Sequence, residues 1–475
     1  MTVDPLRIAM FSTATSGGAG AAALRVHDSV RLVGAQSTLF VGRLERMKHA
    51  GVVRLGAADE GRQPPVVSNF TIFSVDAPGI PDDPLERIIG EADVFNLHWC
   101  ARFVSLSNIE RMSRSGKPVV LTIRDMNPLT GGCHFFHGCS NWKGDCSPCP
   151  QFVQSEGALP SATLEAKKAL WDLDNITVVV LSEHTRRIVE VSSLFARSRV
   201  ETIANPIDTT VFRPQDSEHV RREFNITPQR RVIAYLPSFS SAVKGFDEAQ
   251  VVLRSVSREM TGCLVLCAGR LGQTLDVGMD VVNVGFIADK RRLARFYGCA
   301  DVTLVPSTEE TFSNTAAESV ACGTPVVGFE TGAIAEIARR ERGRAVPVGD
   351  TDALSSALAA ILRSKKPAKA ELHRYIANRF GARDIGRRYI RLFDELRADA
   401  RADRVATNSS NAAADRRTEA RARLDVMMEQ YLERRGHLTL GLQRLLHAAK
   451  LFLWSNREFR RKLREKWLTR LRLGA

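Results

Sequence analysis

Long hydrophobic runs are absent from this chain of 475 residues. No run approaches the roughly 20 uncharged residues that a membrane-spanning helix needs. The first residues, MTVDPLRIAMFS, also lack the basic start and long apolar centre of a signal peptide. We therefore expect a cytoplasmic protein. In that compartment its nine cysteines stay reduced, so a cluster of them indicates metal or redox chemistry before disulfides.

Two sequence signatures are also missing. The glycines of SGGAGAAA, residues 16–23, do not spell G-x-G-x-x-G, which argues against a dinucleotide-dependent oxidoreductase. No nucleic-acid-binding motif accompanies the basic charge, so we expect no nucleic-acid partner.

The composition is that of a globular protein, with 44% hydrophobic and 25% charged residues. The length predicts two or three domains. The net charge of +14 is concentrated at one end, because residues 401–475 hold 18 Lys and Arg against 8 Asp and Glu, a net of +10. We therefore expect the basic tail, residues 401–475, to be a separate part from the body of the chain, residues 1–400.

Short β-branched runs alternate with helical patterns through the body, which predicts βαβ units and parallel sheets covered by helices on both faces. The series is interrupted over residues 204–231 and restarts at Arg231. We predict an α/β protein with two Rossmann-like domains facing a cleft, residues 1–207 and 208–380, then a crossover helix over 381–400 and a helical tail over 401–475. The ten predicted strands are RIAMFS, STLFVG, DVFNLHW, PVVLTI, TVVVLS, RVIAYLPS, CLVLCAG, VVNVGF, VTLVPS and TPVVGF.

The stretch EETFSNTAAESVACGTPVVGF, residues 309–329, contains two carboxylates that flank a predicted helix start. Ser313 is the expected N-cap, with Glu310 on the preceding loop and Glu318 in the second turn. A helix N-terminus binds anions such as a pyrophosphate, whereas carboxylates accept hydrogen bonds from hydroxyls. The order of groups therefore suits a nucleotide sugar, with a hexose at one end and a ribose at the other.

These motifs resemble the family 4 retaining glycosyltransferases, which have the GT-B fold. Glu310 to Glu318 resembles their E-x7-E motif, and ACGTPVVGF resembles the segment that follows it. The remaining matches are SGGAGAAA, IANPIDTTVFRP, VKGF and VGFIADKRRLARFYGCADVTLVPS, which together with the E-x7-E segment span about residues 6–390.

The resemblance implies roles for individual residues in the second domain. Glu310 would contact the donor sugar and Glu318 the ribose hydroxyls. Lys244 would neutralise the diphosphate. The backbone amides around three consecutive residues would cradle the same diphosphate: Phe312, Ser313 and Asn314.

The resemblance implies further roles in the first domain. The loop glycines would allow close approach of donor and acceptor: Gly17, Gly18 and Gly20. His98, in NLHWC, would lie near the reacting sugar; the alternative is a packed histidine at a sheet edge. The family often has an arginine shortly before the lysine of VKGF, and the segment LPSFSSAVKG has none.

The implied reaction moves a glycosyl group from a nucleotide diphosphate to an acceptor hydroxyl with retention of configuration. No catalytic metal is expected. The alternative is a catalytically silent GT-B relative that binds sugar nucleotides or acts as a scaffolding subunit.

Four cysteines lie within 17 residues of a turn-rich loop, residues 130–151: Cys133, Cys139, Cys146 and Cys149. Such a set of thiols is a natural ligand set for a structural zinc ion, and His134 or His137 could each replace one thiol. Reduced thiols and a regulatory disulfide are the alternatives. The loop resembles an insertion in family 4 enzymes that build bacterial exopolysaccharides of the colanic-acid type. Asp125, just ahead of it, is either an acceptor contact or a loop cap.

The C-terminal tail combines an apolar stripe with a basic face. Phe459, Leu463, Trp467 and Leu471 recur every four residues. Such a helix suits an anionic membrane surface, where lipid-linked acceptors reside. A solvated helix that packs on a partner is the alternative. We therefore expect a peripheral protein at the inner face of the cytoplasmic membrane, which extends a lipid-linked or oligosaccharide acceptor.

Overall fold

The computed structural model describes residues 5–43, 49–56, 72–77, 79–151, 158–236, 242–269, 275–406 and 427. The chain divides into two compact units, Met1–Arg417 and Thr418–Ala475, and all elements below belong to the first. The predicted amphipathic tail helix lies outside the described residues. Within the described ranges, no helix has the length and apolar character needed to cross a membrane.

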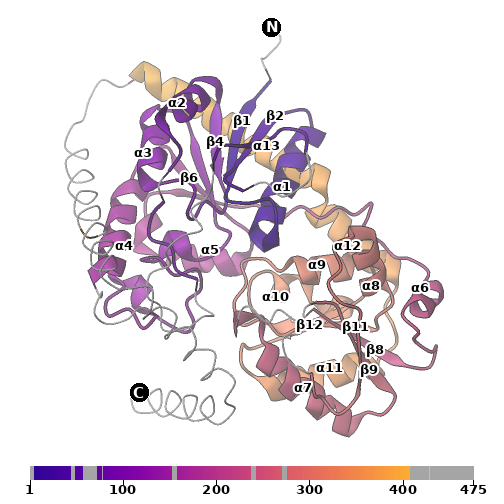
Figure 1. The fold of residues 1–475 in the computed structure, drawn as a ribbon. Coiled ribbons are helices and arrows are strands. Elements are labelled where there is room, and N and C mark those ends of the chain that lie inside the picture. Colours follow the sequence, from indigo (N-terminus) through magenta and orange to yellow (C-terminus); the bar gives the residue numbers. More distant parts are fainter. Residues whose placement is uncertain are drawn as a thin grey trace, which may run out of the picture. The chain divides into compact units, whose positions relative to one another are not determined.

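The first sheet has seven strands in the order β3-β2-β1-β4-β5-β6-β7 (Figure 1). Every pairing between neighbouring strands is parallel. The strands are β1 Arg7–Ser12, β2 Gln36–Val41, β3 Val52–Arg54, β4 Val94–Leu97, β5 Val119–Thr122, β6 Ile176–Val180 and β7 Arg199–Thr202. The helices are α1 Gly17–Leu32, α2 Asp82–Glu91, α3 Leu106–Arg114, α4 Ala158–Trp171 and α5 Glu183–Glu190.

The second sheet has six parallel strands in the order β10-β9-β8-β11-β12-β13. The strands are β8 Arg231–Tyr235, β9 Cys263–Cys267, β10 Asp280–Asn283, β11 Val302–Val305, β12 Val326–Phe329 and β13 Gly343–Val346. The helices are α6 Ser217–Glu223, α7 Phe246–Glu259, α8 Lys290–Gly298, α9 Asn314–Ala321, α10 Ile334–Ile337, α11 Thr351–Arg363 and α12 Lys369–Phe380.

The predicted fold class is confirmed: two parallel α/β sheets follow one another along the chain, and the second begins at Arg231 as predicted. All ten predicted strands are present. Three further strands, β3, β7 and β13, were not predicted, and each lies at the edge of its sheet. Residues of β3 and β7 are only half-buried or exposed, so these strands lack the apolar run that marks a central parallel strand.

The helix α13, Ala382–Ala406, follows directly after α12 and packs against α1 of the first domain. In Figure 1 it is the light-orange helix that runs back along the first sheet's helices. The two helices are in close contact at Gly386. A Cβ atom there would lie 2.2 Å from the carbonyl oxygen of Ser29 in α1, so only glycine fits between the two backbones.

We predict that Gly386→Ala lowers the free energy of unfolding by about 1–3 kcal/mol, because α13 must move away from α1. Urea denaturation measures the change. Gly90→Ala in α2 is the matched control: its added methyl meets no atom within 4 Å, and we expect a gain of about 0.4–1 kcal/mol. Equal stability of the two variants would contradict the close α1–α13 contact.

Candidate functional site

The candidate residues gather where the strand order of each sheet reverses. In open parallel sheets, ligands bind outside the carboxyl ends of the two strands at this point. In the first sheet these strands are β1 and β4, which lead to Gly17 and His98. In the second they are β8 and β11, which lead to Lys244 and Glu310. The topology therefore brings together residues that are far apart in the sequence.

Lys244 and Glu310 form an ion pair, with 2.6 Å between Nζ and Oε1. Lys244 ends a short 3-10 helix, Ala242–Lys244, and the next residue, Gly245, has a φ of +68°. A Cβ atom on Gly245 would lie 1.8 Å from the carbonyl oxygen of Pro306, just after β11. Glycine is therefore required at this turn, and the turn places the lysine beside the loop that carries Glu310.

The N-terminus of α9, at Asn314, lies four residues beyond Glu310. Ser313 is the N-cap, as predicted, and its Oγ accepts a hydrogen bond from the amide of Ala316. The first-turn amides of Asn314 and Thr315 have no intrahelical acceptor. They therefore remain available to an anion, together with the positive end of the helix dipole.

Glu318, in the second turn of α9, is buried and paired with a cation of the first domain. Its Oε1 lies 2.5 Å from the guanidinium of Arg25 in α1, and the Tyr297 hydroxyl lies 3.4 Å from its Oε2. The sequence does not indicate this Arg25–Glu318 pair, which joins residues 293 positions apart.

The glycines of the β1–α1 loop differ in their constraints. Gly17 has a φ of +69°, a conformation that L side chains rarely adopt. A Cβ atom on Gly20 would lie 2.5 Å from the carbonyl oxygen of Ala14. Gly18 has neither constraint. Two of the three glycines are therefore needed to form the loop itself, whatever binds there.

His98 is buried at the carboxyl end of β4, and its Nδ1 lies 2.9 Å from the guanidinium of Arg124. Burial lowers the pKa of the imidazole well below its usual value, and the charge of Arg124 lowers it further. His98 is therefore neutral. It lines a pocket of the first domain together with Trp99, Arg124, Asp125, Lys167 and Trp171.

Asp125 uses both carboxylate oxygens within its own loop. Oδ1 accepts a hydrogen bond from the amide of Asn127, and Oδ2 lies 2.5 Å from Nδ1 of His134. The Nε2 atom of His134 contacts the Ser74 hydroxyl. Asp125 therefore acts as a loop cap, and it also lines the first-domain pocket.

The four cysteines of the 130–151 loop share one neighbourhood. Cys133 and Cys146 are buried, and Cys139 and Cys149 are half-buried. Burial raises the pKa of the Cys133 thiol to about 12, and the other three thiols add to that effect. Within the described part of the chain, no three of these sulfurs lie within 4.8 Å of one another. The loop is thus compact without a metal-ligand arrangement.

The same loop contacts the second domain through Glu309, which the sequence does not single out. The Glu309 carboxylate accepts hydrogen bonds from the backbone amides of Phe136, at 2.7 Å, and His137, at 2.6 Å. Burial raises the pKa of this carboxyl, although the two amides oppose the shift. The cysteine loop therefore holds the residue immediately ahead of Glu310.

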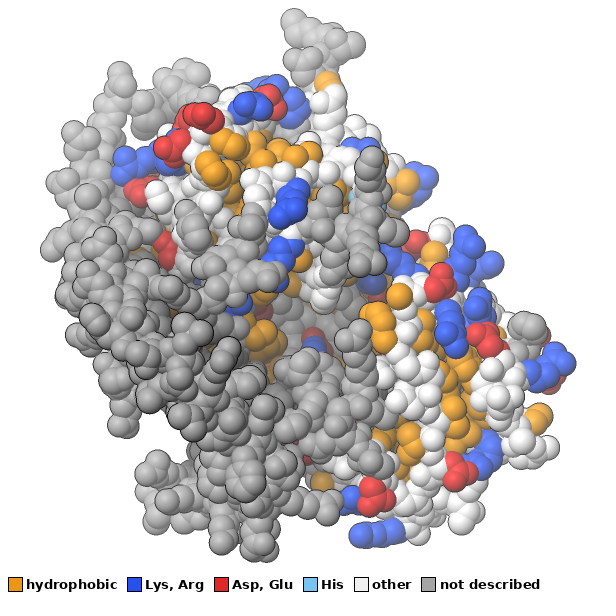
Figure 2. Space-filling model, in the orientation of Figure 1, with side chains coloured by type: hydrophobic (Ala, Val, Ile, Leu, Met, Phe, Trp, Pro, Cys, Tyr) orange, Lys and Arg blue, Asp and Glu red, His pale blue; other side chains and the backbone are white. Residues whose placement is uncertain are grey.

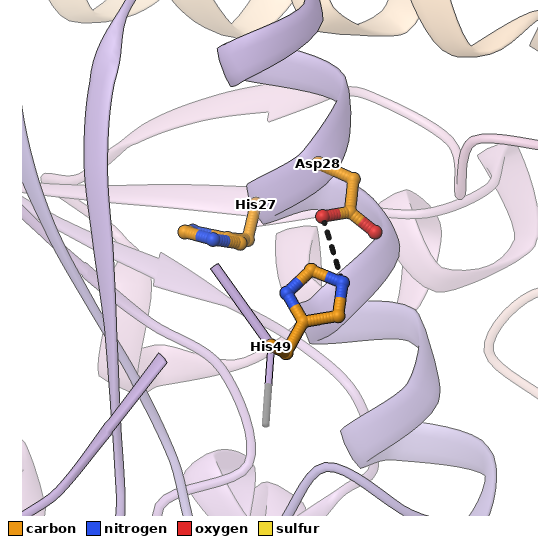
Figure 3. A group of neighbouring side chains, drawn as sticks. All are labelled: His27, Asp28 and His49. Carbon is orange, nitrogen blue, oxygen red and sulfur yellow. Dashed lines mark ion pairs between the residues drawn. The ribbon is translucent and has the colours of Figure 1, made fainter. Parts of the chain in front are cut away.

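One group of possible metal ligands does lie within 4.8 Å among the described residues: His27, Asp28 and His49 (Figure 3). His49 pairs with Asp28 at 3.4 Å. Both ring nitrogens of buried His27 already have partners, the hydroxyl of Ser37 and the carbonyl of Ala50. We therefore assign His27 a structural role that ties α1 to β2.

Charge on the described surface is mixed. On the face drawn in Figure 2, basic and acidic side chains of the described residues are interspersed rather than gathered by sign. This distribution agrees with the net charge of only +4 that remains once the tail's +10 is set aside. The body therefore shows no one-sign patch on the described part of that face.

The fold and the placement of these residues define a GT-B architecture. Solved structures share this fold: sucrose-phosphate synthase from Thermosynechococcus elongatus matches with a TM-score of 0.59 and 17% identity, over 83% of this chain and all of that one. Anabaena HepE, solved with UDP-glucose, matches with a TM-score of 0.57 and 15% identity, over 82% of this chain and all of that one.

Sequence comparisons cover a smaller part. Residues 230–364 match the family described as glycosyl transferases group 1. The D-inositol 3-phosphate glycosyltransferase of Mycobacterium marinum is 28% identical over 190 residues, which are 37% of this chain and 40% of that protein. The chain thus spans less than half the length of this curated relative. The residues matched to the family model include Lys244, Glu310 and Glu318.

Proposed function

We propose that the protein is a retaining glycosyltransferase that moves a sugar from a nucleotide-diphosphate sugar to an acceptor hydroxyl. The observation that carries this proposal is the Lys244–Glu310 pair immediately ahead of the N-terminus of α9. A cation and free helix amides suit a diphosphate, and a carboxylate beside them suits sugar hydroxyls. The family match over residues 230–364 supports the same assignment.

In this reaction the bond between the sugar's anomeric carbon and the diphosphate oxygen breaks, and the nucleoside diphosphate leaves with the electron pair. The acceptor oxygen bonds to the same face of that carbon, and its proton passes to the departing phosphate. The required contribution of the protein is stabilisation of the leaving diphosphate. Lys244 and the amides of Phe312, Ser313 and Asn314 would supply it, and no catalytic metal is needed.

Donor binding would also rearrange two ion pairs. Lys244 neutralises Glu310, and Arg25 neutralises Glu318, in the unliganded arrangement. A diphosphate would attract Lys244, which releases Glu310 to accept from a hydroxyl of the donor sugar. Ribose hydroxyls would share Glu318 with Arg25. The two ion pairs would thus hold both carboxylates in position until hydroxyls arrive.

The acceptor would lie on the side of the first domain. The glycine loop with Gly17, Gly18 and Gly20 permits close approach, and His98 lines the adjoining pocket with Asp125. We further propose a lipid-linked or oligosaccharide acceptor in bacterial exopolysaccharide synthesis of the colanic-acid type. This acceptor proposal is based on the cysteine-loop resemblance. The basic tail would attach the protein peripherally to the cytoplasmic face of an anionic membrane.

The decisive experiment is a panel assay of the purified protein with UDP-, GDP- and ADP-sugars, in which release of nucleoside diphosphate is followed. Lys244→Ala should reduce release by about 10²–10³-fold, the loss typical of one missing donor to developing charge. Glu310→Ala should also reduce release, because a hydroxyl of the donor sugar loses its acceptor. Glu259→Ala is the control, because Glu259 pairs with Arg363 at 2.7 Å on the exposed surface of the same domain. It should leave release unchanged.

Other outcomes separate the alternatives. Binding of a nucleotide sugar without turnover, in the presence of lipid-linked acceptors, would favour a silent GT-B relative. Absence of binding for every nucleotide sugar would overturn the proposed donor site at Glu310 and Glu318.

We propose that the cysteine loop takes up one structural zinc ion through Cys133, Cys139, Cys146 and Cys149, with the sulfurs drawn together on binding. Metal analysis of protein purified without chelators should give about one zinc per chain. Cys146→Ser should lose it, whereas Cys263→Ser in β9 should keep it. Zinc-free protein with all thiols titratable would establish reduced cysteines instead, and missing thiols would establish a disulfide.

A further inference from the structure

Arg124 is a buried cation without a carboxylate partner. It follows β5, is only 8% exposed, and forms no ion pair with any residue that the structure describes. Buried charges are normally paired, because the loss of hydration is costly. Burial lowers the pKa of this guanidinium to about 10, which still leaves it charged at neutral pH. The protein therefore retains an uncompensated positive charge at the carboxyl edge of the first sheet.

The guanidinium fixes the proton position on His98. Both Nε and one terminal nitrogen of Arg124 approach Nδ1 of His98, at 3.3 and 2.9 Å. Guanidinium nitrogens only donate hydrogen bonds, so Nδ1 must be the acceptor. The proton of the neutral imidazole is then on Nε2.

The resulting Nε2–H group of His98 is buried and has no hydrogen-bond partner among the described residues. A buried donor left unsatisfied is destabilising, because the hydrogen bond that it made to water is not replaced. Because His98 and Arg124 line the same pocket, a ligand oxygen that reaches this pocket would satisfy the donor.

Arg124 is also connected to the second domain. Its other terminal nitrogen donates to Oδ1 of Asn205, and Nδ2 of Asn205 donates to Oδ1 of Asn314 at 3.1 Å. Asn314 is the first residue of α9. In addition, the Thr311 hydroxyl donates to the carbonyl oxygen of Arg124 at 3.1 Å. One arginine thus links His98 to the helix N-terminus proposed to hold the diphosphate.

We propose that Arg124 is a positioning residue that presents the Nε2–H of His98 to an oxygen of the bound sugar or acceptor. Through Asn205, Arg124 also fixes the position of this Nε2–H donor relative to the N-terminus of α9. The sugar contact rests on the proposed function; the control of the tautomer does not. Lysine cannot replace this arginine, because a single ammonium group lacks the planar fork that serves His98 and Asn205 together.

The first test is ¹⁵N NMR of histidine-labelled protein without ligand, with the His98 signals assigned from His98→Gln. Wild-type protein should show Nδ1 unprotonated and Nε2 protonated. Arg124→Met should shift His98 toward a mixture of tautomers. The matched control is Arg221→Gln, since Arg221 is equally buried but pairs with Asp301 at 2.8 Å in the second domain; it should leave the His98 signals unchanged. An unchanged tautomer in Arg124→Met would overturn the proposal.

The second test is kinetic, with the nucleotide sugar that the panel assay selects. Arg124→Lys and Arg124→Met should both reduce kcat by about 10²-fold, the effect of a misplaced reacting group, with a smaller change in donor KM. Asn205→Ala should reduce kcat with the tautomer retained. Wild-type kcat in Arg124→Lys would show that charge alone suffices and would overturn the positioning role.

The two tests distinguish failure of the Arg124 proposal from failure of the proposed function. If wild-type protein turns over no nucleotide sugar, the proposed function fails, and the NMR spectrum of the unliganded protein still decides whether Arg124 controls His98.

Discussion

The contact between the first domain and the segment from Glu309 to Glu318 is the constraint on which the site depends. Four residues of this segment are held from the other domain. Glu309 accepts from the cysteine loop, and Glu318 pairs with Arg25 of α1. The carbonyl of Thr311 accepts from the hydroxyls of Ser182 and Thr185. Asn314 completes the set through Asn205.

Because of these contacts, the arrangement of the candidate residues in one domain depends on the other domain. The anion-binding end of α9 belongs to the second sheet, whereas Gly17 and His98 belong to the first. Neither sheet alone, at the point where its strand order reverses, offers both a place for a diphosphate and a pocket beside it. The α1–α13 contact joins Gly386 to Ser29 of α1, four residues beyond Arg25. A change in either contact would therefore alter the alignment of the candidate residues as well as stability.

Two ion pairs bring cations of the site next to its carboxylates. Lys244 faces Glu310, and Arg25 faces Glu318, so each carboxylate suited to hydroxyls is already matched by a cation. Arg124 has no such match, and its effect falls on His98 and on the N-terminus of α9 instead. The site is thus poised with an excess of positive charge, which suits a ligand that brings a diphosphate.

The sequence is sufficient to predict the buried framework. Central strands such as β5 and β11 are buried along their whole length, and their sequences are rich in β-branched and apolar residues. The edge strands β3 and β7 are not, and they were missed. The N-cap at Ser313 follows from local chemistry and was predicted. The partners of Glu309 and Glu318 lie 173 and 293 positions away, and no local pattern reports a contact at that separation.

The most direct measurement of the central claim is a crystal structure with a bound nucleotide sugar, chosen from the UDP, GDP and ADP forms. We expect the diphosphate at the amides of Ser313 and Asn314, with Lys244 turned toward it and the ribose beside Glu318. A diphosphate bound anywhere else on the protein, with the Lys244–Glu310 pair left intact, would contradict it.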